Sequence, residues 1–123
     1  KFGENVKKSK KNLINIFKDI KNKKHKIIGY GATAKATTVL NYCKINEKII
    51  DYFVDTTPDK INRFMPGTKI KIKKYNQKLL DNVNYIYLGA WNFKDEIFKK
   101  EKKFIKKGVK FITHVPFPRI IKK

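Results

Sequence analysis

The chain has 123 residues, of which 41% are hydrophobic, so it is long enough for one domain with a single buried core. Its net charge of +21 invites a nucleic-acid-binding interpretation, but only Arg63 and Arg119 among its 31 basic residues are arginines, and the lysines are spread along the whole chain. This distribution favours a solvated lysine surface over a nucleic-acid-binding face.

The sequence also disfavours membrane, secreted, disulfide-bonded and cysteine-rich metal-binding proteins. The apolar runs are too short for a transmembrane span, and lysines interrupt every early apolar stretch, so no signal peptide is expected. Cys43 is the single cysteine, which excludes a disulfide within the chain and a cysteine-rich metal site. These features predict a cytoplasmic setting without membrane or nucleic-acid partners. Because the chain begins at Lys1, we expect it to be part of a longer protein.

Hydrophobic periodicity predicts an alternation of helices and strands. In chain order we expect a helix at 4–22, a strand at 26–29, a helix at 34–44, strands at 49–54 and 69–72, a short helix at 76–81, a strand at 85–88, a helix at 93–107 and a strand at 110–115. Gly108 should end the last helix, and Pro116 and Pro118 the last strand. The alternation predicts one Rossmann-like α/β domain over residues 1–123, with a mainly parallel, doubly wound sheet of about five strands and helices on both faces.

The most informative stretch is Ile-Ile-Gly-Tyr-Gly-Ala-Thr-Ala-Lys at residues 27–35. It is typical of a buried strand that turns tightly into a helix, with Gly31 in the turn and Lys35 in the first turns of the helix. The N-terminus of a helix favours anions, so the motif predicts a site for a phosphorylated or otherwise anionic group. With two glycines it completes neither the dinucleotide-binding nor the Walker pattern, and such turns also occur without a ligand.

Two further segments should meet this turn at the carboxyl edge of the sheet, where ligands of such folds bind. They are residues 55–60 and 89–92. The candidate substrate-binding residues at this edge are Tyr30, Gly31, Ala32, Lys35, Asp55, Lys60, Trp91 and Asn92.

Each side chain in this set has a simpler alternative role. Lys35 and Lys60 could meet phosphate or be surface charges. Asp55 could accept hydrogen bonds from sugar hydroxyls or cap a turn. Trp91 could stack on a ring or pack in the core, and Asn92 could read a ring edge or be a helix N-cap. No catalytic triad and no metal-ligand spacing is present, so we expect neither catalytic nor metal-binding residues here.

Several motifs together carry a family resemblance. They are Gly-Tyr-Gly-Ala-Thr-Ala-Lys at 29–35, Asp-Thr-Thr-Pro-Asp-Lys at 55–60, Pro-Gly-Thr at 66–68, Ala-Trp-Asn-Phe-Lys-Asp-Glu-Ile at 90–97, Gly-Val-Lys-Phe-Ile at 108–112 and Pro-Phe-Pro at 116–118. In order and spacing the chain resembles the C-terminal domain of the sugar C-methyltransferases, enzymes that use S-adenosylmethionine to methylate a carbon of a nucleotide-linked keto-deoxysugar.

The resemblance implies a substrate-side domain in a longer enzyme. A zinc-binding N-terminal region and a central methyltransferase domain would be its partners and would hold zinc, S-adenosylmethionine and the catalytic base. This chain would bind the nucleotide sugar and be inactive alone, without a cofactor of its own. The alternative is a non-catalytic nucleotide-binding or regulatory module of the same fold.

Overall fold

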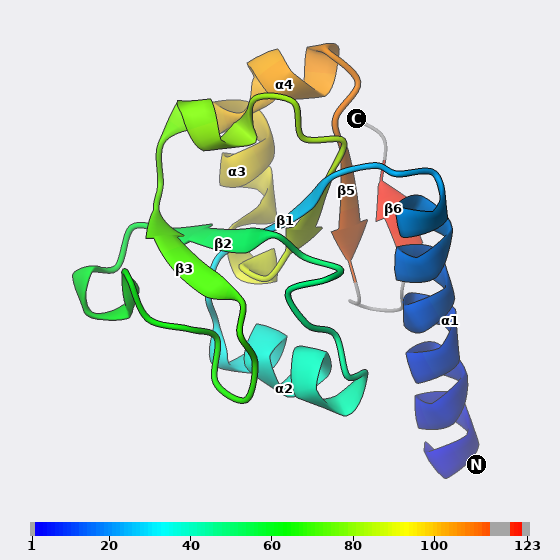
Figure 1. The fold of residues 1–123 in the computed structure, drawn as a ribbon. Helices are drawn as coiled ribbons and strands as arrows, with labels where there is room; N and C mark the ends of the chain where they lie inside the picture. Colours follow the sequence, from blue (N-terminus) through cyan, green and yellow to red (C-terminus); the bar gives the residue numbers. More distant parts are fainter. Residues whose placement is uncertain (1, 114–118, 122–123) are drawn as a thin grey trace.

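The computed structural model describes residues 2–113 and 119–121 (Figure 1). A long N-terminal helix precedes a compact unit of short strands and helices. Its elements are α1 (Phe2–Asn22), β1 (Ile27–Tyr30), α2 (Ala34–Tyr42), β2 (Tyr52–Asp55), η1 (Pro58–Lys60), β3 (Lys71–Lys74), η2 (Gln77–Leu80), β4 (Tyr85–Leu88), η3 (Trp91–Phe93), α3 (Lys94–Lys100), α4 (Lys102–Lys106), β5 (Lys110–Thr113) and β6 (Arg119–Ile121).

Within the described residues, six strands form one sheet in the order β3-β2-β1-β4-β5-β6. The pairs that join β3, β2, β1, β4 and β5 are all parallel, and β6 runs antiparallel to β5. The strand order reverses between β1 and β4, because β2 and β3 lie on one side of β1 while β4 and β5 lie on the other. Such a switch point opens a crevice at the carboxyl ends of its strands.

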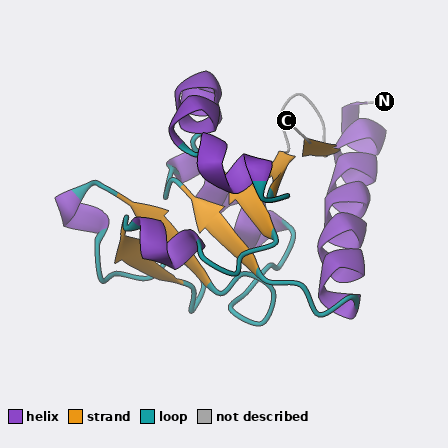
Figure 2. Ribbon diagram, turned by 90° about the horizontal axis from the view of Figure 1, so that it is seen from above, coloured by secondary structure: helices purple, strands orange, loops and turns teal. Residues whose placement is uncertain are grey.

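Helices cover both faces of the sheet (Figures 1 and 2). On one face, Phe17 of α1 and Leu40 of α2 belong to a core cluster with Phe53 of β2. On the other face, Ile97 of α3 and Phe104 of α4 belong to a second cluster. The strands supply both clusters because neighbouring residues point to opposite faces. The predicted Rossmann-like α/β class with a mainly parallel sheet is therefore confirmed.

Some predicted boundaries were wrong. The strand expected from residue 49 begins at Tyr52, because the N–H groups of Ile49 and Ile50 bond the carbonyl of Asn46 in a turn. The strand expected at 69–72 lies at Lys71–Lys74, and the helix expected to reach 44 ends at Tyr42, since Lys44 adopts a positive φ of 56°.

The C-terminal third also differs from the prediction. The single helix expected at 93–107 is three pieces, η3, α3 and α4, and the break between α3 and α4 falls at the buried Glu101. The strand β6 was not predicted, because its three residues carry no usable alternation. The end of the strand expected at 110–115, with Pro116 and Pro118, lies outside the described residues.

Candidate functional site

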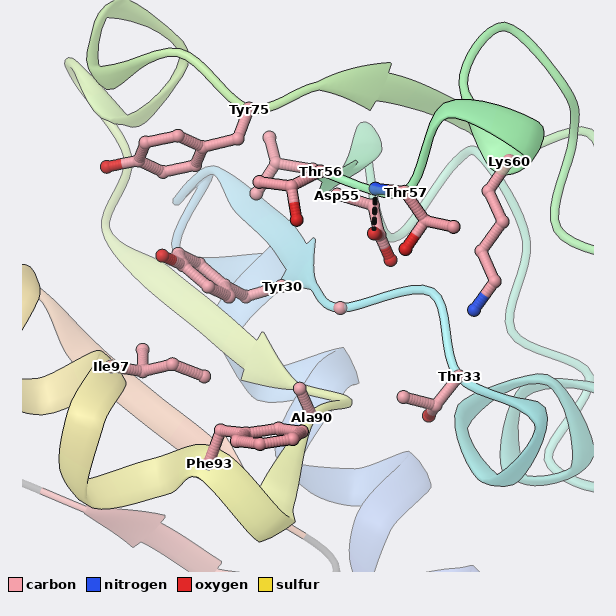
Figure 3. A pocket seen from close by; sticks show the side chains of 12 residues that line it. Tyr30, Thr33, Asp55, Thr56, Thr57, Lys60, Tyr75, Ala90, Phe93 and Ile97 are labelled. Carbon is pink, nitrogen blue, oxygen red and sulfur yellow. Dashed lines mark hydrogen bonds between the residues drawn. The ribbon is translucent and has the colours of Figure 1, made fainter.

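A cleft of about 320 Å³ lies at the carboxyl ends of the central strands (Figure 3). Its volume is within the usual range for small-molecule sites. The loops that follow β1, β2 and β4 build most of it, and Tyr75 after β3 and Ile97 of α3 complete it. It is lined by Tyr30, Gly31, Thr33, Val54, Asp55, Thr56, Thr57, Lys60, Tyr75, Ala90, Phe93 and Ile97.

The glycine turn after β1 is shaped by its contact with the loop after β4. Gly31 has a φ of +93°, and a Cβ at this position would lie 2.5 Å from the Cβ of Ala90. A Cβ on Gly89 would in turn lie 2.2 Å from the carbonyl oxygen of Gly31. Both glycines are thus required by the close approach of two backbone segments, independent of any ligand.

Asp55 fixes this turn from the neighbouring strand. Its Oδ2 accepts a 2.7 Å hydrogen bond from the N–H of Ala32, and its Oδ1 accepts a 2.8 Å bond from the N–H of Thr57 (Figure 3). Burial alone would raise the pKa of Asp55, but these backbone donors, with the positive charge of Lys60, lower it below its ordinary value. The carboxylate therefore links the loops after β1 and β2.

Lys60 holds the same peptide from the other side. Its half-buried ammonium group donates a 2.7 Å hydrogen bond to the carbonyl oxygen of Ala32. The N–H groups of Gly31 and Thr33 are bonded to the carbonyls of Val54 and Gly31. The turn is consequently a rigid part of the cleft wall, and its N–H groups at residues 31–33 are already used within the chain.

Thr33 begins the helix that follows. Its side-chain oxygen accepts a hydrogen bond from the N–H of Ala36, which makes it the N-cap of α2, and its hydroxyl donates to the carbonyl of Gly89. In the part of the chain that the structure describes, the N–H groups of Ala34 and Lys35 have no backbone partner, as is usual in the first turn of a helix. These two N–H donors lie at the N-terminal end of α2, which favours anions.

Lys35, Trp91 and Asn92 lie in a smaller cavity of about 110 Å³ beside the cleft. The two hollows share Thr33 and Ala90 in their lining, together with Phe93, whose ring is 57% exposed. Lys35 and Asn92 are exposed, and Trp91 is half-buried with the ammonium group of Lys94 5.2 Å from its ring centroid. The structure thus gathers seven of the eight predicted residues at one edge, in two adjoining hollows, whereas the buried Ala32 lines neither.

Tyr30 is engaged inside the protein. Its hydroxyl donates a 2.6 Å hydrogen bond to Oε2 of Glu101, and Tyr75 donates a 2.7 Å bond to the same oxygen. Burial and the neighbouring carboxylate raise the pKa of both phenols well above their ordinary value. Both tyrosines present their rings to the cleft and remain protonated at neutral pH.

Sequence reasoning missed several lining residues. Thr33, Thr57, Tyr75, Phe93 and Ile97 line the cleft, but none was in the predicted set. Thr33 carried a usable signal as a threonine directly before a predicted helix. Thr57 lies in the segment 55–60 that was expected at this edge, whereas Tyr75, Phe93 and Ile97 depend on which segments the tertiary fold brings there.

The sheet order and the cleft together define a class of protein, a Rossmann-like α/β domain with a ligand-sized cleft at its switch point. Residues 1–116 match the family described as the C-methyltransferase C-terminal domain. C-methyltransferase NovU from Streptomyces niveus is 36% identical over 95 residues, which make up 77% of this chain and 23% of NovU. The chain belongs to the C-methyltransferase C-terminal domain family, as its motifs predicted, and it spans less than a quarter of that relative's length.

No helix in residues 2–113 is long and apolar enough to cross a membrane. Among the described residues, no three His, Cys, Asp or Glu side chains gather where they could hold a metal ion.

Proposed function

We propose that this chain is the substrate-side domain of an S-adenosylmethionine-dependent C-methyltransferase that acts on a nucleotide-linked deoxysugar. The single observation that carries the proposal is the cleft at the switch point, in a domain of the C-methyltransferase C-terminal family. Its 320 Å³ volume suits part of a nucleotide sugar rather than the whole, so the rest of the ligand would contact another domain.

The cleft has two chemically different ends. Thr33, Thr57 and the charge of Lys60 lie at one end, whereas Tyr30, Tyr75 and Ile97 lie at the other (Figure 3). The positive charge of Lys60 attracts a diphosphate, and the exposed first turn of α2 with Lys35 adds to that attraction. Asp55 and Lys60 support the ligand indirectly here, by fixing the peptide of Ala32.

This chain offers S-adenosylmethionine no complete site, because the glycine turn after β1 lacks the third glycine of the dinucleotide-binding pattern. Asp55, the carboxylate after β2, already accepts one backbone hydrogen bond on each oxygen and fixes the turn. We therefore assign the S-adenosylmethionine site, the zinc site and the catalytic base to the partner domains of a longer cytoplasmic enzyme. Residues 1–123 act in it as one domain that is inactive on its own.

A non-catalytic nucleotide-binding module would use the same cleft. It is distinguished from the substrate-side domain by the coding sequence upstream of Lys1: a cysteine-rich zinc pattern followed by a methyltransferase motif supports the enzyme.

Ligand binding is tested by a chemical-shift titration of the chain with a nucleotide sugar. Lys35→Ala should weaken binding by roughly ten-fold, the scale of one charge-assisted contact. Lys106→Ala, at the end of α4, is the control that removes the same charge outside the cleft and should change little. Equal losses from both substitutions would mean diffuse attraction to a +21 protein and would overturn the site.

A further inference from the structure

Glu101 is the least expected side chain in the molecule. It lies between α3 and α4, its residue is 0% exposed, and lysines precede and follow it in the chain. A buried carboxylate without a cationic partner is costly, because it loses its hydration. Only one of its oxygens is satisfied: Oε2 accepts two tyrosine hydroxyls, and Oε1 has no hydrogen-bond partner. The described chain shows no ion pair for Glu101.

The two hydroxyls come from distant segments. Tyr30 ends β1, and Tyr75 follows β3 on the other side of β2. Their ring centroids lie 5.8 Å apart with the planes tilted by 59°. Figure 3 shows both hydroxyls directed toward the end of the cleft that lies away from Lys60 and Thr33. Glu101 therefore holds the two hydroxyl groups, and the aromatic rings of Tyr30 and Tyr75 line the cleft.

We propose that Glu101 is a positioning residue: it fixes Tyr30 and Tyr75 as an apolar wall against which the base of a nucleoside diphosphate packs. The inference rests on the proposed function and assigns the two ends of the cleft to the two halves of the ligand. The base lies at the end with Tyr30, Tyr75 and Ile97, and the diphosphate lies at the end with Lys60. Because the hydroxyls are held by Glu101, they are withheld from the base, so this end recognises a flat ring rather than a hydrogen-bonding pattern.

The arrangement also accounts for the retained carboxylate. An apolar residue at position 101 would fill the site without a desolvation cost, but it would leave two buried hydroxyls unpaired and the rings free to turn. The ammonium group of Lys100 lies 3.9 Å from the ring centroid of Tyr75 and further restrains that ring.

The experiment compares two probes, uridine diphosphate and inorganic pyrophosphate, by calorimetric titration of the chain. Tyr75→Phe keeps the ring and removes the hydroxyl that binds Glu101. It should weaken uridine diphosphate binding by about three- to ten-fold, the scale of one aromatic contact, and leave pyrophosphate binding unchanged. Glu101→Gln, a weaker acceptor of the same shape, should act in the same direction. Tyr42→Phe on α2 is the matched control, because Tyr42 is 45% exposed and lies outside the cleft.

A merely structural role for Glu101 would lower the melting temperature of Tyr75→Phe and Glu101→Gln without changing the ratio of the two affinities. That unchanged ratio, in folded variants, overturns the inference. If the wild-type chain binds neither probe, the proposed function itself fails. Wild-type binding of uridine diphosphate with a selective loss in both variants supports both proposals.

Discussion

Removal of the Asp55 carboxylate should loosen the turn on which the cleft depends. Asp55→Ala deletes the acceptor of two backbone N–H groups, those of Ala32 and Thr57, at 2.7 and 2.8 Å. A hydrogen bond to a charged group contributes about 1.5–3 kcal/mol, and partial exposure of this carboxylate places each bond at or below the low end. The two together should contribute about 2–3 kcal/mol to the free energy of unfolding.

For a chain of this length, that loss corresponds to a fall in melting temperature of about 8–12 °C. Thermal unfolding followed by circular dichroism measures it. Asp55→Asn retains one oxygen acceptor and should lose roughly half as much. Hydrogen exchange gives a local readout, since the amide of Ala32 should exchange faster in Asp55→Ala than in the wild type.

Asp59→Ala is the matched control. Asp59 lies in η1 four residues further on, its side chain is exposed, and it accepts none of the hydrogen bonds found in the described chain. This substitution removes the same charge without breaking the two backbone hydrogen bonds that Asp55 accepts, so the melting temperature should hardly change. Equal losses of melting temperature in Asp55→Ala and Asp59→Ala would refute the claim that Asp55 holds the two loops together.

Three further predictions follow from the same geometry. Asp55 has a lowered pKa, so its stabilisation is fully present above its ordinary value of 3.8 and is lost as the pH falls through the lower value of the folded state. The difference in unfolding free energy between wild type and Asp55→Asn should therefore shrink in acid titrations as the pH falls below 3.8. Gly31→Ala should destabilise the chain by at least 1–2 kcal/mol more than Gly108→Ala in denaturant unfolding, because both have positive φ but only a Cβ at Gly31 would collide with Ala90; equal effects would contradict the close-approach argument. The isolated chain should show no saturable binding of S-adenosylmethionine at micromolar concentrations by calorimetry, and clear binding would reverse the assignment of that cofactor to the partner domains.

The alternation of strands and helices was readable from the sequence because β1, β2 and β4 are short, mainly apolar runs separated by turn residues. The glycine turn also identified the carboxyl edge, and the structure places Lys35 and Trp91 there together. This part of the prediction rests on local patterns and on the geometry of parallel sheets.

The use of each side chain was less predictable. Asp55 was left open between a ligand contact and a turn cap, and the structure shows it bonding the backbone of two loops. That outcome depends on the separation of neighbouring loops, which local sequence does not determine. The hydroxyl of Tyr30 likewise found its partner 71 residues away.

Glu101 did leave a signal in the sequence. It follows Ile97 by four residues and precedes Ile105 by four, so helical periodicity places it on the apolar face of the helix. A single acidic residue at a core position indicates a buried polar partner. Which partner it finds depends on the tertiary fold, because Tyr30 and Tyr75 come from distant segments.

The most direct test of the central claim is an amide chemical-shift map of the chain during titration with a nucleotide sugar. The account predicts the largest shifts at the cleft, at Gly31, Thr57 and Ala90. A third hollow of about 520 Å³, lined in part by Lys99, Lys102 and Lys106, offers the ligand positive charge outside the cleft. Largest shifts at those lysines, or small shifts spread evenly over the surface, would contradict the claim that the cleft holds the nucleotide.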